Sequence, residues 1–124
     1  MPASQRPVFL HLLKIRLPLT GWVSIVHRIT GVLLFLLLPL PLYLLQLSLE
    51  SEEGFSQVLS WMAAWPLRLL MLLFLWWFVH HLLAGTRCLF IDMDRGVGLV
   101  AARRSAAILL TADLVLLLGG LLLL

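Results

Sequence analysis

Two adjacent histidines, His80 and His81, stand inside the apolar stretch WWFVHHLLAGTRCLFID at residues 76–92. On a helix, His81, Gly85 and Cys88 share one face, because residues three or four positions apart stack along the axis. Such a histidine and glycine suit a flat macrocycle, since imidazole is an axial ligand and glycine lets the ring approach the backbone. In a soluble helix, paired histidines are more often core or interface residues, but ionisable residues inside a bilayer are rare and usually functional.

A second group of chemically active side chains occurs earlier, in the segment SIVHRITG at residues 24–31. Ser24 and Arg28 share one helical face, and His27 lies beside it. A guanidinium and a hydroxyl together can hold a carbonyl or a propionate by hydrogen bonds. The alternative is an arginine that extends to the membrane surface and a serine that caps the helix, and the residues alone leave both readings open.

The elements that must position these residues are membrane spans, as the composition indicates. Of the 124 residues, 62% are hydrophobic and 12% are charged, whereas about 25% of residues are charged in soluble domains. This is the composition of an integral membrane protein, and its spans leave no room for a soluble catalytic domain of ~100 residues. Cys88 is the only cysteine, which excludes an intrachain disulfide and zinc sites built on cysteine pairs.

Three apolar stretches predict an all-α membrane protein with three transmembrane helices that form a bundle together with other chains. We expect an N-terminal arm over residues 1–20 and an anchor over residues 21–124, with spans at about residues 21–46, 66–91 and 104–124. Pro39 and Pro41 each remove a backbone donor, so the first helix should kink or unwind in its outer half. Residues 47–62 are expected to form an acidic loop.

The basic residues set the expected orientation. The first loop has no lysine or arginine, whereas six basic residues lie in the arm and the second loop, namely Arg6, Lys14, Arg16, Arg95, Arg103 and Arg104. By the positive-inside rule, the N-terminus and the second loop are cytoplasmic. Because the net charge of +3 comes from residues at the ends of apolar runs, no nucleic-acid partner is expected.

Helix geometry places the two groups of side chains at different depths. His81 precedes Asp92 by three turns, or about 16 Å at ~1.5 Å per residue, which is near the middle of the bilayer. Arg28 and His27 lie nearer the cytoplasm. A ring ligated by His81 would direct its acidic edge toward them, and a quinone near Ser24 and Arg28 would lie closer to the cytoplasm. This arrangement suits electron transfer among a cytoplasmic donor, a quinone and a haem.

The motifs closely resemble the cytochrome b subunit of succinate dehydrogenase, the cytochrome b556 membrane anchor of respiratory complex II. The resemblance is carried by RPV at 6–8, SIVHRITG at 24–31, EEGF at 52–55, HLLAGTRCLFID at 81–92 and RSA at 104–106. It extends over almost the whole chain, and the block SxxHRxTG is its most specific part.

The resemblance implies a function in the citric acid cycle and the respiratory chain. In this family, succinate is oxidised at FAD in a flavoprotein subunit, and electrons pass through an iron–sulfur subunit to ubiquinone. Two small anchors hold these subunits on the bacterial inner membrane, form the quinone site and bind haem b between them, and an isolated anchor has no dehydrogenase activity. By position, His81 resembles the axial ligand of the haem iron, Ser24 and Arg28 resemble quinone-site residues, and His27 and Arg28 resemble neighbours of the haem propionates.

Some residues depart from the family pattern. Cys88 stands where a histidine or aromatic residue is usual, His80 is unusual beside His81, and Asp113 has no expected counterpart. Asp113 lies well inside the third helix, so it should face a protein neighbour and be protonated or paired with a polar group. Two alternatives are an anchor that binds quinone without haem, and a small transporter or structural subunit in which Arg28, His81 and Asp113 form a proton or cation path.

Overall fold

The computed structural model describes residues 16–123, and all regular secondary structure in this part of the chain is helical. The helices are α1 (Leu19–Leu37), α2 (Pro39–Glu50), α3 (Glu52–Ala63), α4 (Trp65–Asp92) and α5 (Leu99–Leu122). Within the described residues, three helical stretches are long and apolar enough to cross a membrane, namely Leu19–Glu50, Trp65–Asp92 and Leu99–Leu122. The predicted fold class, an all-α protein with three spanning helices, is confirmed.

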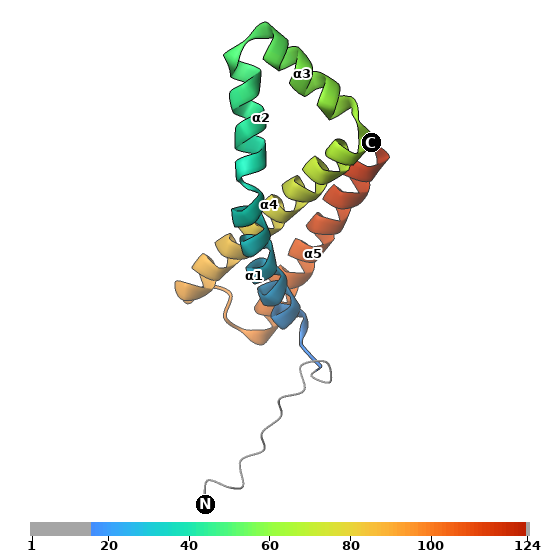
Figure 1. Ribbon diagram of the computed structural model, residues 1–124. Coiled ribbons are helices and arrows are strands. Elements are labelled where there is room, and N and C mark those ends of the chain that lie inside the picture. Colours follow the sequence, from blue (N-terminus) through green and yellow to red (C-terminus); the bar gives the residue numbers. More distant parts are fainter. Residues whose placement is uncertain (1–15, 124) are drawn as a thin grey trace, which may run out of the picture.

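The first spanning stretch bends at Leu38, as the two prolines predict. α1 ends at Leu37, and Pro39 opens α2. The Leu38 N–H still donates to the Leu34 carbonyl at 2.8 Å, but Pro39 and Pro41 have no N–H to continue the ladder. Since Leu38 keeps a helical φ of −51° and ψ of −36°, the chain continues into α2 without an intervening loop (Figure 1).

The prediction of a loop over residues 47–62 is wrong, because this segment is almost entirely helical. α2 continues through its first residues, and α3 follows with Ser51 as its N-cap. The Ser51 hydroxyl accepts a hydrogen bond from the Gly54 N–H at 3.0 Å. Glu52 and Glu53 lie in the first turn of α3, where carboxylates stabilise the positive end of the helix dipole. Glu52 and Glu53 therefore open a capped helix, and Glu50 is the last residue of α2.

The second loop is shorter than expected. α4 ends at Asp92 and α5 begins at Leu99, ahead of the predicted start near residue 104. Asp94 and Gly96 have φ values of 57° and 75°, a left-handed conformation that short polar residues and glycine tolerate. These two residues let the chain reverse direction over a short connection.

The N-terminal arm expected over residues 1–20 lies mostly outside the described residues. Its described part starts at Arg16, and α1 already begins at Leu19. The RPV motif at residues 6–8 is likewise outside the described residues, so the geometry of the site rests on the motifs in α1 and α4.

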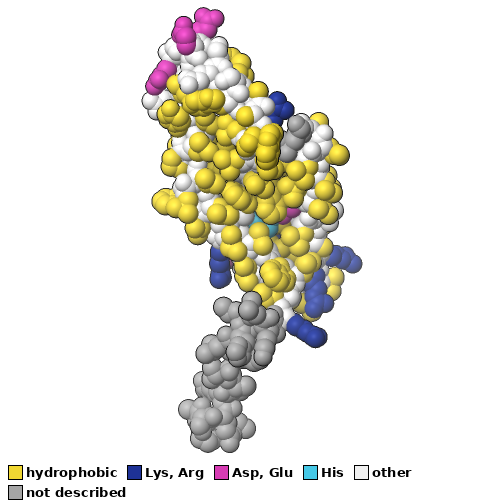
Figure 2. Space-filling view, turned by 45° about the vertical axis from the view of Figure 1, so that its right-hand side comes forward, with side chains coloured by type: hydrophobic (Ala, Val, Ile, Leu, Met, Phe, Trp, Pro, Cys, Tyr) yellow, Lys and Arg dark blue, Asp and Glu magenta, His cyan; other side chains and the backbone are white. Residues whose placement is uncertain are grey.

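α1, α4 and α5 pack together at one end of the molecule, and α2 and α3 form the other end (Figure 1). The small core contains Val23 of α1, Ala84 of α4, and Ala106 and Leu109 of α5. Small residues allow membrane helices to approach closely, as the two alanines do here. Figure 2 shows apolar side chains over the body of the molecule, acidic side chains at the α2–α3 end, and most basic side chains at the opposite end.

Candidate functional site

The two helices that carry the sequence motifs, α1 and α4, cross at their histidines. The imidazole rings of His27 and His81 stack, with centroids 4.2 Å apart and planes inclined by 25°. A Cβ added at Gly31 would lie 2.9 Å from His81 Cε1, and one added at Gly85 would lie 3.4 Å from His27 Nε2. Each imidazole therefore lies against the glycine of the other helix, and the gap expected beside Gly85 receives the His27 ring.

A backbone carbonyl fixes the orientation of His81. Its Nδ1 lies 3.0 Å from the carbonyl oxygen of His27, which also accepts the Thr30 hydroxyl at 3.0 Å. Because a carbonyl only accepts, Nδ1 of His81 carries the proton and Nε2 keeps its lone pair. Within residues 16–123, no group forms a hydrogen bond with Nε2 of His81. This nitrogen is also not one of the fully buried polar atoms. Its lone pair therefore reaches the surface of the chain.

The neighbouring His80 points toward α5 and is enclosed by the chain. Its side chain is 0% exposed, and its Nδ1 lies 2.5 Å from Oδ2 of Asp113 on α5. The expectation that Asp113 faces a polar protein neighbour is confirmed. His80 Nε2 and Asp113 Oδ1 are buried without a partner among the described residues. His80 cannot reach a ligand outside the chain in this arrangement, whereas His81 can.

Ser24 and Arg28 lie one turn apart on α1 and, unlike His27 and His81, are not part of the ring stack at the crossing. Arg28 is exposed and Ser24 is partly exposed. Neither makes a hydrogen bond to another residue of the 16–123 stretch. His27, between them in sequence, has a buried Nε2 that also lacks a hydrogen-bond partner in this part of the chain. The structure thus brings His27 and His81 together and leaves the polar groups of Ser24 and Arg28 available to a ligand or another subunit.

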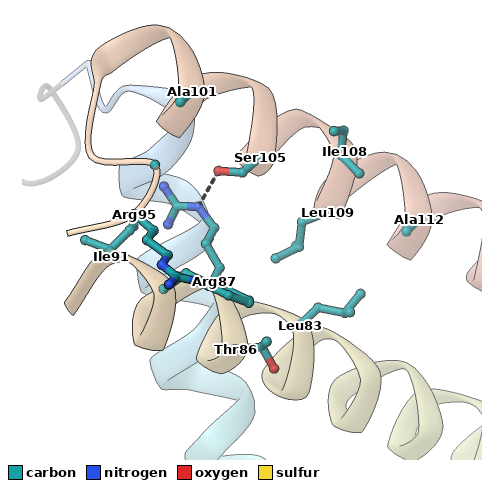
Figure 3. Close-up of a pocket in the computed structure, with 12 residues that line it drawn as sticks. Leu83, Thr86, Arg87, Ile91, Arg95, Ala101, Ser105, Ile108, Leu109 and Ala112 are labelled. Carbon is teal, nitrogen blue, oxygen red and sulfur yellow. Dashed lines mark hydrogen bonds between the residues drawn. The ribbon is translucent and has the colours of Figure 1, made fainter. Parts of the chain in front are cut away.

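A cavity of about 550 Å³ lies between α4 and α5. It is mostly apolar, and none of the four site residues predicted from the sequence lines it. At one end, Arg87 donates from Nε to the Ser105 hydroxyl at 3.0 Å (Figure 3). A terminal nitrogen of Arg87 also donates to the Ala102 carbonyl at 3.3 Å. No sequence signal predicts this cavity, because it depends on how far two apolar helices diverge.

Sequence reasoning also missed two features of the histidine pair. One is the carbonyl of His27 as the acceptor for His81, and the other is Gly31 as the surface on which the His81 ring lies. The sequence did contain a signal for the contact with Gly31, because His27 and Gly31 on α1 have the same spacing as His81 and Gly85 on α4.

Comparison with known proteins agrees with the motifs. The profile of the family described as succinate dehydrogenase/fumarate reductase transmembrane subunit matches residues 2–120. The chain is 37% identical over 92 residues to the succinate dehydrogenase cytochrome b556 subunit of Coxiella burnetii (strain RSA 493 / Nine Mile phase I), which covers 73% of each chain. It is 32% identical over 113 residues to the subunit of the same name from Paracoccus denitrificans, which covers 91% of this chain and 87% of the relative.

Proposed function

Because the chain belongs to the family of succinate dehydrogenase/fumarate reductase transmembrane subunits, we propose that it binds haem b through His81 and forms part of a quinone site with Ser24 and Arg28. Its partners are a second small anchor, an iron–sulfur subunit and a flavoprotein subunit with FAD. Electrons from succinate reach ubiquinone through these subunits, and the chain alone has no dehydrogenase activity. The membrane is the bacterial inner membrane, with the N-terminus in the cytoplasm.

The observation that most supports haem ligation is the bond from His81 Nδ1 to the His27 carbonyl. Metal-ligating histidines are usually held in this way, with one ring nitrogen donating to an acceptor and the other directed at the metal. A histidine of the other anchor would complete the ligation, so that the two chains would hold the haem together. A bound haem b accepts and releases one electron at a time.

The residues around His81 fit the acidic edge of such a ring. His27 Nε2 is buried without a partner in the described part of the chain, and the Arg28 guanidinium is exposed one residue further along. Arg28 can donate to a carboxylate with two parallel bonds, and the His27 imidazole can donate to one when its ring turns out of the contact with Gly85. We assign them to the haem propionates, and Arg28 also to the quinone with the Ser24 hydroxyl.

The test is purification of the complex through a tagged copy of this chain, with identification of the subunits and a reduced-minus-oxidised absorption spectrum. The wild-type complex should contain the three partner subunits and a b-type haem. His81→Ala should lose the haem absorption while His80→Ala retains most of it, because His80 faces α5. Haem retained in full by His81→Ala would contradict the assignment, and a purified chain without haem or partner subunits would contradict the function.

A further inference from the structure

We propose that Asp113 determines which of the two adjacent histidines is available to the haem, by holding His80 inside the chain. The proposal rests on the haem ligation by His81 proposed above. It assigns a role to the buried pair of His80 and Asp113, which the proposed function does not involve. His80 and His81 are consecutive on the same helix, so only the rotation of α4 about its axis distinguishes them.

Apolar packing alone defines this rotation weakly. α4 has the sequence WPLRLLMLLFLWWFVHHLLAGTRCLFID, with large apolar side chains on every side. In a bilayer the lipid tails are as apolar as leucine, so no hydrophobic force selects which side of the helix faces its neighbours. A rotation of about 100° would bring His80 to the direction that His81 now faces. Beside the close approach of the His27 ring to Gly85, polar contacts must therefore fix the rotation.

Polar contacts hold α4 toward α1 and toward α5, where Arg87 also donates to Ser105 and Ala102. At the level of the two histidines, only the contact toward α5 is selective. Toward α1, the His81 ring donates to the His27 carbonyl at 3.0 Å, but a backbone carbonyl would accept equally from either imidazole. Toward α5, His80 meets the carboxylate of Asp113 at 2.5 Å. Among the described residues, Asp113 is the one buried acidic side chain. It has a fixed position on the α5 side, so it pairs with the histidine that faces α5.

Burial makes this pair hard to exchange. The side chains of His80 and Asp113 are 0% and 4% exposed, and no solvent in the membrane interior can replace a broken bond. A rotation of α4 would leave both groups buried and unpaired, which costs more than losing a bond in water. Trp76, one turn before His80, lies beside its ring with centroids 6.3 Å apart and shields it further. Asp113 thus keeps His80 from competing with His81.

The experiment compares Asp113→Leu with Leu109→Ala in the complete purified complex. Leu109 is buried at 5% exposure one turn before Asp113, so its truncation loosens the same helix pair and spares the His80–Asp113 contact. The readouts are the haem content, the thermal midpoint and the paramagnetic resonance spectrum of the oxidised haem, which reports the identity and orientation of the axial ligands. Asp113→Leu should add a second low-spin signal and lower the haem content. Leu109→Ala should lower the thermal midpoint and keep a single signal.

Two further variants separate ligand selection from packing. Asp113→Asn retains an acceptor for the His80 N–H and should give the single wild-type signal. The double variant His80→Leu/Asp113→Leu lacks the competing imidazole and should lose the second signal. A single wild-type signal in Asp113→Leu at full haem content, or a second signal that persists in the double variant, would overturn the proposal. If Asp113→Leu fails to assemble, a double variant that assembles with one signal supports the proposal, and one that does not assemble overturns it.

Failure of the underlying haem assignment would look different. In that case, His81→Ala alone would keep the wild-type signal, whatever the variants at residue 113 show. Loss of the haem in His81→Ala, combined with an unchanged signal in Asp113→Leu, would leave the assignment intact and refute the role of Asp113.

Discussion

The polar side chains of α1 divide into those that are satisfied within the chain and those that are not. Thr30 is buried and donates to the His27 carbonyl. Ser24 and Arg28 make no hydrogen bond within the part of the chain that the structure describes. Since a guanidinium carries five donors in a planar fork, the exposed Arg28 keeps its full capacity to bind an oxygen of a ligand.

Arg28→Leu should lower succinate:quinone activity about tenfold or more, because a hydrogen bond to a charged group contributes about 1.5–3 kcal/mol. Ser24→Ala should lower it less, since a neutral hydroxyl forms the weaker bond. Both variants should keep succinate oxidation with a soluble artificial acceptor, measured on the same preparation. Arg103→Leu is the matched control, because Arg103 is also exposed. Wild-type quinone reduction in both variants would move the quinone site elsewhere.

At this scale, sequence reasoning found the side chains but not their partners. His81 stands out because its type, its spacing to Gly85 and its depth in an apolar helix are all local properties. The acceptor for its Nδ1 is a backbone carbonyl, which carries no residue signature. The partner of His80 lies 33 positions away on α5, so it depends on the register between two apolar helices, which hydrophobic patterning does not specify.

At the scale of helices, the crossing of α1 and α4 depends on close approach at two glycines. The contact at Gly31 is the tighter one, since a Cβ there would lie 2.9 Å from the His81 ring and 3.4 Å from its Nδ1. The ring cannot simply move aside, because the same Nδ1 is bonded to the His27 carbonyl. A side chain at this position would displace the His81 ring from its acceptor.

Gly31→Ala should therefore weaken haem binding about 10–100-fold, the usual effect of disturbing the groups that orient a metal ligand. Titration of haem loss with increasing detergent or temperature measures it. Gly119→Ala is the control, because nothing lies within 4 Å of a Cβ added there. Alanine favours a helix over glycine by about 1 kcal/mol, so a loss at residue 31 would come from the contact. Equal haem retention in the two variants would contradict this role of Gly31.

A helix could be predicted from the sequence where it has a long apolar run or a proline that marks its end. The spans and the bend at Leu38 follow from long apolar runs and from two prolines. α3 was missed because its segment is short and acidic, and its cap becomes recognisable only with Ser51 placed before Glu52 and Glu53. The start of α5 was placed too late because Arg103 and Arg104 were assigned to the loop, whereas they lie in its first turns.

At the scale of the whole molecule, charge separates the two ends (Figure 2). The corner between α2 and α3 carries Glu50, Glu52 and Glu53, and the loop between α4 and α5 is flanked by arginines. Because basic loops remain on the cytoplasmic side during insertion, this asymmetry supports a single orientation with the acidic corner outside.

Cysteine labelling with a membrane-impermeant maleimide tests this orientation in a Cys88→Ser background. Gln57→Cys on α3 should react in intact spheroplasts, because residue 57 is exposed at the acidic end. Val97→Cys, in the loop between α4 and α5 and also exposed, should react only after the membrane is opened. The reverse pattern would mean that the N-terminus faces outward, and the cytoplasmic position of the quinone site would fail with it.

The bend at Leu38 also affects how the protein meets bilayers of different thickness. Leu19–Glu50 contains 32 residues, or about 48 Å of helix at ~1.5 Å per residue, whereas the hydrocarbon layer is about 30 Å thick. Such an excess is usually relieved by tilting or kinking. α1 is held by its crossing with α4, so the change in tilt falls on α2, beyond Leu38. The His27–His81 contact should therefore keep its geometry in thin and thick membranes alike.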